Sequence, residues 1–208
     1  MKAKKALSLI LAAAMAYMAV IAASAERSEL TEEHSTGNTE VIAHISGTDP
    51  GDVTYIISIP DVVDFGELHV PDSSSSNDYK LVDYQVTLEM VNGLDPDTQN
   101  INVYVKDQGF NANGDQHFYI ANQSATDIKF SYDVFDVSAE NVDDTTVNIN
   151  RNTATSSLGF LLHSFQYQGE KMNGSLRIDQ LDLLSYPISQ IVGDYSGFMV
   201  FTSMIEDK

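Results

Sequence analysis

The stretch YQVTLEM (residues 84–90) alternates strictly between apolar and polar side chains. In a β-strand, successive side chains point to opposite faces of the sheet, so the alternation sorts the two kinds of side chain onto two faces. The apolar set is Tyr84, Val86, Leu88 and Met90, and the polar set is Gln85, Thr87 and Glu89. The stretch therefore predicts a strand that covers a hydrophobic core with one face and meets water with the other.

Similar short segments recur along the chain and are separated by connections rich in Gly, Pro, Asn, Asp and Ser, which favour turns. Only IDQLDLL (178–184) is also compatible with one helical turn. About ten strands of this kind predict an all-β, antiparallel two-sheet sandwich, immunoglobulin-like or jelly-roll-like. The other candidate strands are TEVIAHI (39–45), VTYIISI (53–59), INVYVK (101–106), HFYIA (117–121), DIKFSYDVF (127–135), TTVNIN (145–150), LGFLLHSFQY (158–167), GSLRI (174–178) and the closing run FMVFTSM (198–204).

The beginning of the chain has the layout of a secretory signal peptide. Basic residues among the first five are followed by an apolar run, Ala6–Ala22, and by the small residues Ala23–Ala25. We expect cleavage after Ala25, a polar flexible leader over 26–38 and one sandwich domain over 39–208. The alternative is an uncleaved membrane anchor, for which the apolar run is at the short limit. The sequence thus predicts a secreted protein, extracellular or at the cell surface, without membrane contact after cleavage.

The charge of the chain excludes several classes of partner. It has 11 Lys and Arg against 30 Asp and Glu, a formal net charge of −19. Nucleic acids and anionic membrane surfaces attract positive charge, so neither is an expected partner. The chain has no cysteine, which rules out a disulfide framework and a thiolate metal site. We therefore expect a soluble acidic surface and a fold held by its core.

No motif for catalysis is present. The sequence contains no His-Glu-x-x-His zinc spacing, no Gly-x-Ser-x-Gly nucleophile elbow and no phosphate loop after a strand. Carboxylates are so numerous that no pair of them indicates glycoside hydrolysis. The sequence therefore predicts a protein that is not an enzyme and has no cofactor other than, as a candidate, calcium. The isolated histidines are His34, His44, His69, His117 and His163.

One loop, NGLDPDTQN (92–100), is a candidate calcium site. Calcium prefers carboxylate, amide and carbonyl oxygens, and the loop offers Asp95, Asp97 and Asn100 close together in sequence. The loop is not an EF-hand. The alternative is an ordinary turn in which Asx side chains bond their own backbone.

A second candidate is the polar stretch VNINRN. On a strand, Asn148, Asn150 and Asn152 would share one face, where a row of amides can bind sugar hydroxyls beside a Tyr104 or Tyr167 platform. The alternative is an ordinary solvated outer face.

The closing run is unusually apolar for the end of a chain. Phe198, Met199, Val200 and Phe201 are consecutive, as in a strand covered on both faces. Either the segment LGFLLHSF or another chain would cover the second face. Phe198 and Val200 are therefore candidate interaction residues.

Two segments resemble parts of exported surface proteins of Gram-positive bacteria. VTYIISIPDVVDFGEL (53–68) is similar to a segment of the form Tyr-Thr-Val-Thr-Ile-Pro-x-x-Val-x-Phe-Gly, and GDYSGFMVFTSMIED (193–207) resembles a common ending, Gly-x-Tyr-x-Gly-x-x-x-Phe-x-x-x-x-Glu. The resemblance implies a β-sandwich module of adhesin, pilin-like or WxL-like type. Tryptophan is absent, so no WxL signature exists. The matching residues are Ile59, Pro60, Val63, Phe65, Gly66, Gly193, Tyr195, Gly197, Phe201 and Glu206.

Together these features predict a non-enzymatic secreted surface module that acts in adhesion or in the assembly of a surface fibre or complex. Its partner would be another surface protein or a second copy, joined by exchange of the terminal strands TEVIAHI or FMVFTSM. A carbohydrate-binding module, with a glycan as partner, is the alternative. A glycan hydrolase is the third hypothesis.

Overall fold

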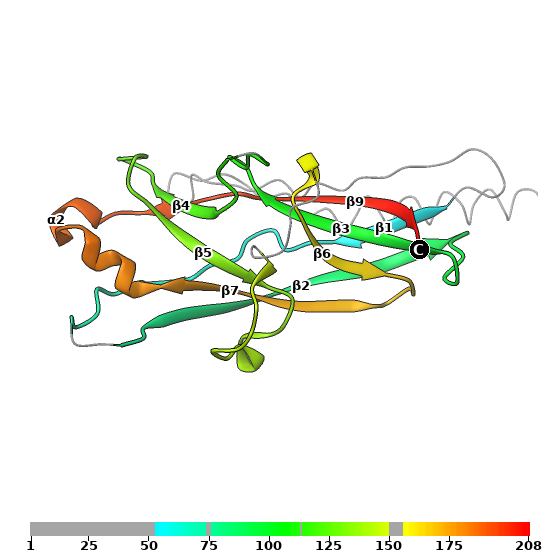
Figure 1. Ribbon diagram of the computed structural model, residues 1–208, viewed down its shortest axis with the longest axis horizontal. Helices are drawn as coiled ribbons and strands as arrows, with labels where there is room; N and C mark the ends of the chain where they lie inside the picture. Colours follow the sequence, from blue (N-terminus) through cyan, green and yellow to red (C-terminus); the bar gives the residue numbers. More distant parts are fainter. Residues whose placement is uncertain (1–52, 74–75, 113, 150–155) are drawn as a thin grey trace, which may run out of the picture. The chain divides into compact units, whose positions relative to one another are not determined.

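The computed structural model describes residues 53–73, 76–112, 114–149 and 156–208 (Figure 1). All of them fall in the second of the two units into which the chain divides, Met1–Thr39 and Glu40–Lys208. The expected signal peptide (1–25), leader (26–38) and first strand (39–45) lie outside the described residues. No helix in the described ranges is long and apolar enough to cross a membrane.

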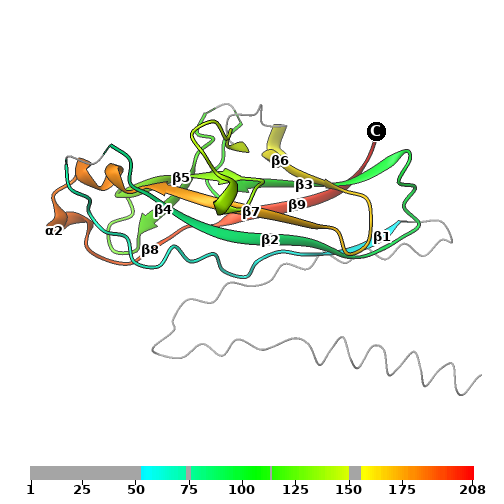
Figure 2. The ribbon, with the colours of Figure 1, turned by 90° about the horizontal axis from the view of Figure 1, so that it is seen from below.

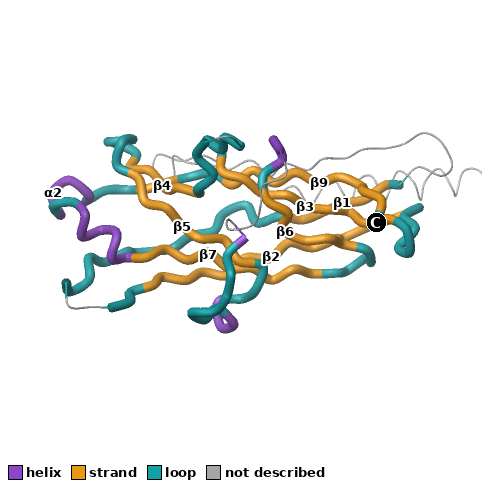
Figure 3. The backbone as a smooth tube through the Cα atoms, viewed as in Figure 1, coloured by secondary structure: helices purple, strands orange, loops and turns teal. Residues whose placement is uncertain are grey.

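Strands account for most of the regular structure, and the helical segments are short (Figure 3). The helical segments are η1 (Ala139–Asn141), η3 (Ser156–Leu158), η4 (Gln180–Ser185) and α2 (Ile188–Ile191). The strands are β1 (Thr54–Ser58), β2 (Tyr79–Asn92), β3 (Gln99–Asp107), β4 (Phe118–Asn122), β5 (Lys129–Phe135), β6 (Phe160–Phe165), β7 (Lys171–Asp179), β8 (Tyr195–Ser196) and β9 (Met199–Asp207).

The strands form two antiparallel sheets. One has six strands in the order β1-β2-β7-β5-β4-β8, and the other has three in the order β6-β3-β9. In both ribbon views the strands of the two sheets follow roughly the same line, as in aligned sandwiches (Figures 1 and 2). The all-β, two-sheet fold predicted from the sequence is therefore confirmed.

The hydrophobic core lies between the inner faces of the two sheets. From YQVTLEM, the side chains of Tyr84, Val86 and Leu88 are buried there, as the alternation predicts. Phe118 on β4 and Phe160 on β6 are fully buried, and their ring centroids lie 6.0 Å apart. Because these two strands belong to different sheets, the pair joins the layers at the centre of the core.

Two sequence assignments need comment. TTVNIN was expected to be a strand, but residues 146–148 carry no strand, so that assignment is wrong. The segment IDQLDLL contains the end of a strand and a helical turn: β7 continues to Asp179, and η4 begins at Gln180. The Asp179 carboxylate accepts a hydrogen bond from the backbone N–H of Leu181 and so caps this turn.

Two buried tyrosines make the fold sensitive to alkaline pH. Burial, with the nearby charge of Asp136, raises the pKa of Tyr84 far above 10, and burial, with the charge of Asp107, does the same to the pKa of Tyr132. The folded state therefore holds protons that the unfolded chain releases near pH 10. Stability is fully present below pH 10 and falls as the pH rises further, by about 1.4 kcal/mol per tyrosine at pH 11.

Denaturant titrations between pH 9 and pH 11 test this expectation. Below pH 10, Tyr84→Phe lowers stability, because the hydroxyl donates a hydrogen bond to the Phe135 carbonyl. It also reduces the loss of stability above pH 10. The same substitution at exposed Tyr167 controls for removal of a hydroxyl. An unchanged pH slope in Tyr84→Phe would contradict the assignment.

Candidate functional site

The edge strands β1 and β9 belong to different sheets and lie beside each other on one side of the sandwich. The hydroxyl groups of Tyr55 on β1 and Ser203 on β9 are 3.1 Å apart. Among the described residues, no strand pairing joins β1 to β9. We call this side, where two strand edges face each other through side chains alone, the β1–β9 seam.

An apolar groove of about 180 Å³ opens along the seam. It exists because the period-two pattern of each strand turns apolar side chains toward the core, while the two backbones do not pair. An apolar cavity of about 150 Å³ holds a benzene molecule. The groove therefore has room for an aromatic or branched aliphatic side chain. Its lining is Tyr55, Ile57, Ile59, Val103, Phe201, Thr202 and Ser203.

Within the described ranges, one edge of strand β9 is unpaired and lacks the usual protection. Natural edge strands commonly carry charges or proline, which hinder pairing with another chain. Residues 199–205 contain neither. Glu206, at the end of the strand, accepts hydrogen bonds from Asn102 and from the Tyr104 hydroxyl, at 2.8 Å for the latter. Its carboxylate is thus directed at β3, and the apolar stretch before it is left uncharged.

The closing run is only partly covered. Phe201 and Ile205 pack against the core, and Val200, which alternates with them, is half-buried. Phe198 precedes β9 and is 52% exposed. The segment LGFLLHSF supplies β6, which pairs with β3 on the side away from β9. LGFLLHSF was expected to cover the closing run, but β6 and β9 lie on opposite sides of β3, so it does not pair with β9.

Gly197 lets the chain pass from one sheet to the other. Figure 2 shows the chain leaving β8, which pairs with β4, and entering β9, which pairs with β3. At this crossing an ideal Cβ on residue 197 would lie 1.9 Å from the Tyr119 carbonyl oxygen. The glycine is therefore required by a close approach of two backbones.

Residues from the segments 53–68 and 193–207 meet at the seam. Ile59 from the first segment and Phe201 from the second line the same groove. Phe65, also in the first segment, packs edge-on against Tyr132 with ring centroids 5.9 Å apart. Ile59 and Phe201 thus line the side of the sandwich where the two sheets are not paired.

Two of the three candidate calcium ligands, Asp95 and Asn100, accept hydrogen bonds from other groups of the chain. The Asp95 carboxylate accepts hydrogen bonds from the Asp97 N–H at 3.0 Å and from the Thr98 hydroxyl at 2.9 Å. The Asn100 side-chain oxygen accepts one from Gln166 at 2.8 Å. Within the described ranges, no group of three or more His, Asp or Glu side chains is placed to hold a metal ion. The arrangement at Asp95 is the Asx turn that the sequence left as an alternative.

The expected row of exposed amides does not form at Asn148. This side chain is 6% exposed and donates a hydrogen bond to the Asp133 carboxylate. Asn150 and Asn152 lie outside the described residues. Of the two proposed tyrosine platforms, Tyr104 is buried, whereas Tyr167 is 61% exposed.

The seam residues Tyr55, Ile57 and Ser203 were not recognised as a site from the sequence. The alternation placed Tyr55 and Ile57 on an inward face, and the structure agrees. This inward face lies at the edge of the sheet because of the strand order. Strand order depends on contacts between distant parts of the chain. The sequence signal available was the uncharged stretch of the final strand.

Comparison with known proteins gives little further information. No protein-family model matches the chain, and no curated protein matches it significantly. Among solved structures, a chain from a structure described as a chaperone–tip adhesin complex vital for synergistic activation of CFA/I fimbriae biogenesis superposes with a TM-score of 0.41 at 13% identity. The match covers 72% of this chain and 40% of the other. So loose a superposition defines neither a common fold nor a common function.

Proposed function

We propose that the protein is a non-enzymatic exported surface module whose β1–β9 seam receives an extended segment from a second copy of the chain, in the assembly of a larger surface complex. The observation that carries the proposal is the seam itself, two neighbouring strand edges with an apolar groove between them. Strand addition uses these features: the free edge supplies backbone hydrogen bonds, and the groove takes alternate side chains.

The proposed occupant is TEVIAHI, residues 39–45. In an extended conformation Val41, Ala43 and Ile45 share one face, which suits the apolar groove. The segment contains a single acidic residue, Glu40, and no proline. It can therefore pair along an uncharged edge such as β9. Pairing of this segment within its own chain would leave a monomer, and the test distinguishes the two cases.

Other properties of the chain agree with a contact function. The uncharged edge of β9 contrasts with a strongly acidic chain, whose like charges would otherwise keep copies apart. The resemblance of residues 53–68 and 193–207 to Gram-positive surface modules supports a place on a bacterial surface, and both segments reach the seam. Secretion through the predicted signal peptide would deliver the protein there.

Light scattering on the secreted chain, residues 26–208, over a range of concentrations tests the proposal. We expect concentration-dependent oligomers. Ser203→Lys places a charge on the inward face of β9 at the groove and is expected to abolish them, because burying an unpaired ammonium group is costly. Met204→Lys adds the same charge to the exposed, outward face and should leave association unchanged.

The melting temperature of both variants shows whether Ser203→Lys still folds. A secreted chain that stays monomeric at millimolar concentration would refute assembly by strand exchange. Equal effects of the two lysine variants would show that charge alone, and not the groove, controls association.

A further inference from the structure

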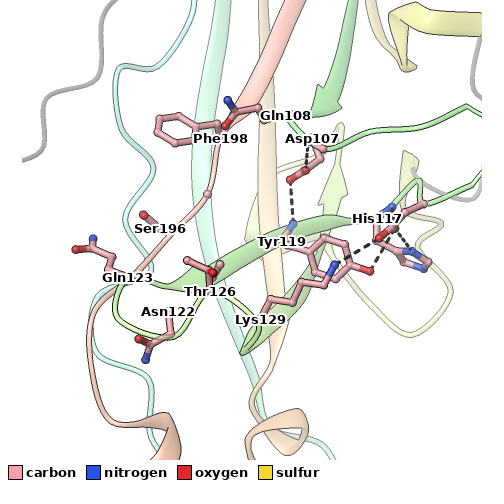
Figure 4. Close-up of a pocket in the computed structure, with 14 residues that line it drawn as sticks. Asp107, Gln108, His117, Tyr119, Asn122, Gln123, Thr126, Lys129, Ser196 and Phe198 are labelled. Carbon is pink, nitrogen blue, oxygen red and sulfur yellow. Dashed lines mark hydrogen bonds and ion pairs between the residues drawn. The ribbon is translucent and has the colours of Figure 1, made fainter.

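A second, larger pocket lies at the β8–β9 crossing (Figure 4). Its volume is about 370 Å³, within the range of pockets that hold small ligands. Three parts of the chain form it: the β3–β4 connection, the β4–β5 turn and the crossing at residues 196–198. The segments are distant in sequence, and the paired strands hold them together.

The pocket wall is organised by internal bonds. The buried Asp107 carboxylate accepts hydrogen bonds from the backbone N–H of Gly109 at 2.7 Å and of Tyr119 at 3.1 Å. These bonds tie the β3–β4 connection to β4. The wall is therefore preorganised, which reduces the entropy lost when a ligand binds.

The charged groups of the pocket are already paired. Lys129 lies 3.5 Å from the Asp115 carboxylate and 3.7 Å from the centre of the Tyr119 ring. Burial alone would raise the pKa of Asp115, but hydrogen bonds from His117 and Tyr119 and the charge of Lys129 lower that pKa overall. The Asp115 carboxylate thus stays ionised and remains paired with Lys129. No cation remains in the pocket for an anionic ligand, and the acidic chain repels one.

Four polar side chains around the pocket have no such internal partner. Gln108, Gln123, Thr126 and Ser196 are exposed, and within the described residues their side chains make no hydrogen bond. Amides and hydroxyls both donate and accept hydrogen bonds, which matches sugar hydroxyls. Phe198, 52% exposed at the rim, offers an apolar ring face on which the C–H face of a sugar ring can pack.

We infer that this pocket binds a neutral oligosaccharide, with Phe198 as the packing surface and the four unpaired polar side chains as hydrogen-bonding groups. The inference goes beyond the proposed function and does not depend on it. It also explains why Phe198 is exposed, because a side chain that binds a ligand must be accessible in the free protein.

Calorimetric titration of the secreted chain with cellotriose, maltotriose and triacetylchitotriose tests the inference, with trigalacturonate as the acidic comparison. We expect at least one neutral trisaccharide to bind and trigalacturonate not to bind. Phe198→Ala should weaken binding about tenfold or more. Ile188→Ala is the control, because this side chain is 63% exposed and does not line the pocket.

Gln108→Ala provides a second variant in the same pocket, with an expected loss of about threefold to tenfold for one or two hydrogen bonds. Failure of all three neutral trisaccharides to bind at millimolar concentration overturns the inference. So does binding that survives Phe198→Ala, or tighter binding of trigalacturonate. Oligomers measured by light scattering are a separate readout, so failure here leaves the seam proposal standing.

Discussion

Phe118→Ala is expected to lower the free energy of unfolding by about 4 kcal/mol, within the usual range of about 3–5 kcal/mol for a buried phenylalanine. The ring is fully buried and lies 5.6 Å from the Tyr132 ring and 6.0 Å from the Phe160 ring, centroid to centroid. Removing it leaves a cavity at the contact between the two sheets, and the paired strands on either side cannot collapse to fill it. Urea denaturation at neutral pH measures the loss.

Two comparisons make this prediction specific. Phe198→Ala removes the same ring from a half-exposed position and should change stability by less than about 0.5 kcal/mol. A double-mutant cycle of Phe118→Ala with Phe160→Ala should show a coupling energy of about 0.5–1.5 kcal/mol, because the rings touch across the layers. Additive effects, or a loss at Phe118 below about 1 kcal/mol, would mean that the sheets do not pack through these rings.

Gly197→Ala is expected to cost about 3 kcal/mol, at the upper end for overpacking. The added methyl group would lie 1.9 Å from the Tyr119 carbonyl oxygen and 3.0 Å from its carbonyl carbon, which are backbone atoms of a paired strand. They cannot turn aside as a side chain can. Relief therefore requires that β4 and the crossing separate, with loss of the β4–β8 pairing at Ala121 and Asn122.

Gly114→Ala is the control for this substitution. The three atoms nearest to its added methyl group all belong to the side chain of Asn111, the first of them at 3.2 Å. We expect it to change stability by less than about 0.5 kcal/mol. Thermal denaturation of the two variants side by side gives the comparison. A Gly197→Ala protein as stable as the Gly114→Ala protein would show that the crossing does not pass so close to β4.

The strands were predictable because their signal is local. In YQVTLEM the alternation identifies a strand and its inward face without reference to any other part of the chain, and Val86 and Leu88 are fully buried as expected. The strand assigned to TTVNIN was wrong because the local signal does not show whether a strand has a pairing partner. Its residues suit a strand locally, but no neighbouring strand pairs with residues 146–148.

The candidate sites were less predictable than the fold, because a polar residue in a turn has two possible partners, a ligand or its own backbone. The Asp95 carboxylate accepts hydrogen bonds from the Asp97 backbone N–H and from the Thr98 hydroxyl. At Asn148 the amide donates a hydrogen bond to the half-buried carboxylate of Asp133. Phe198, which the sequence offered as a candidate interaction residue, is 52% exposed.

By itself, the sequence determined that the chain folds as β-strands, which face of YQVTLEM and of its sister strands enters the core, and that the closing run is too apolar to be wholly solvated. Only the tertiary structure decided which strands lie at the edges, so that β1 meets β9 without pairing and Gly197 carries the chain between sheets. The reason is physical. Side-chain alternation follows from the geometry of a single strand, whereas strand order depends on free-energy differences among contacts between residues far apart in the chain.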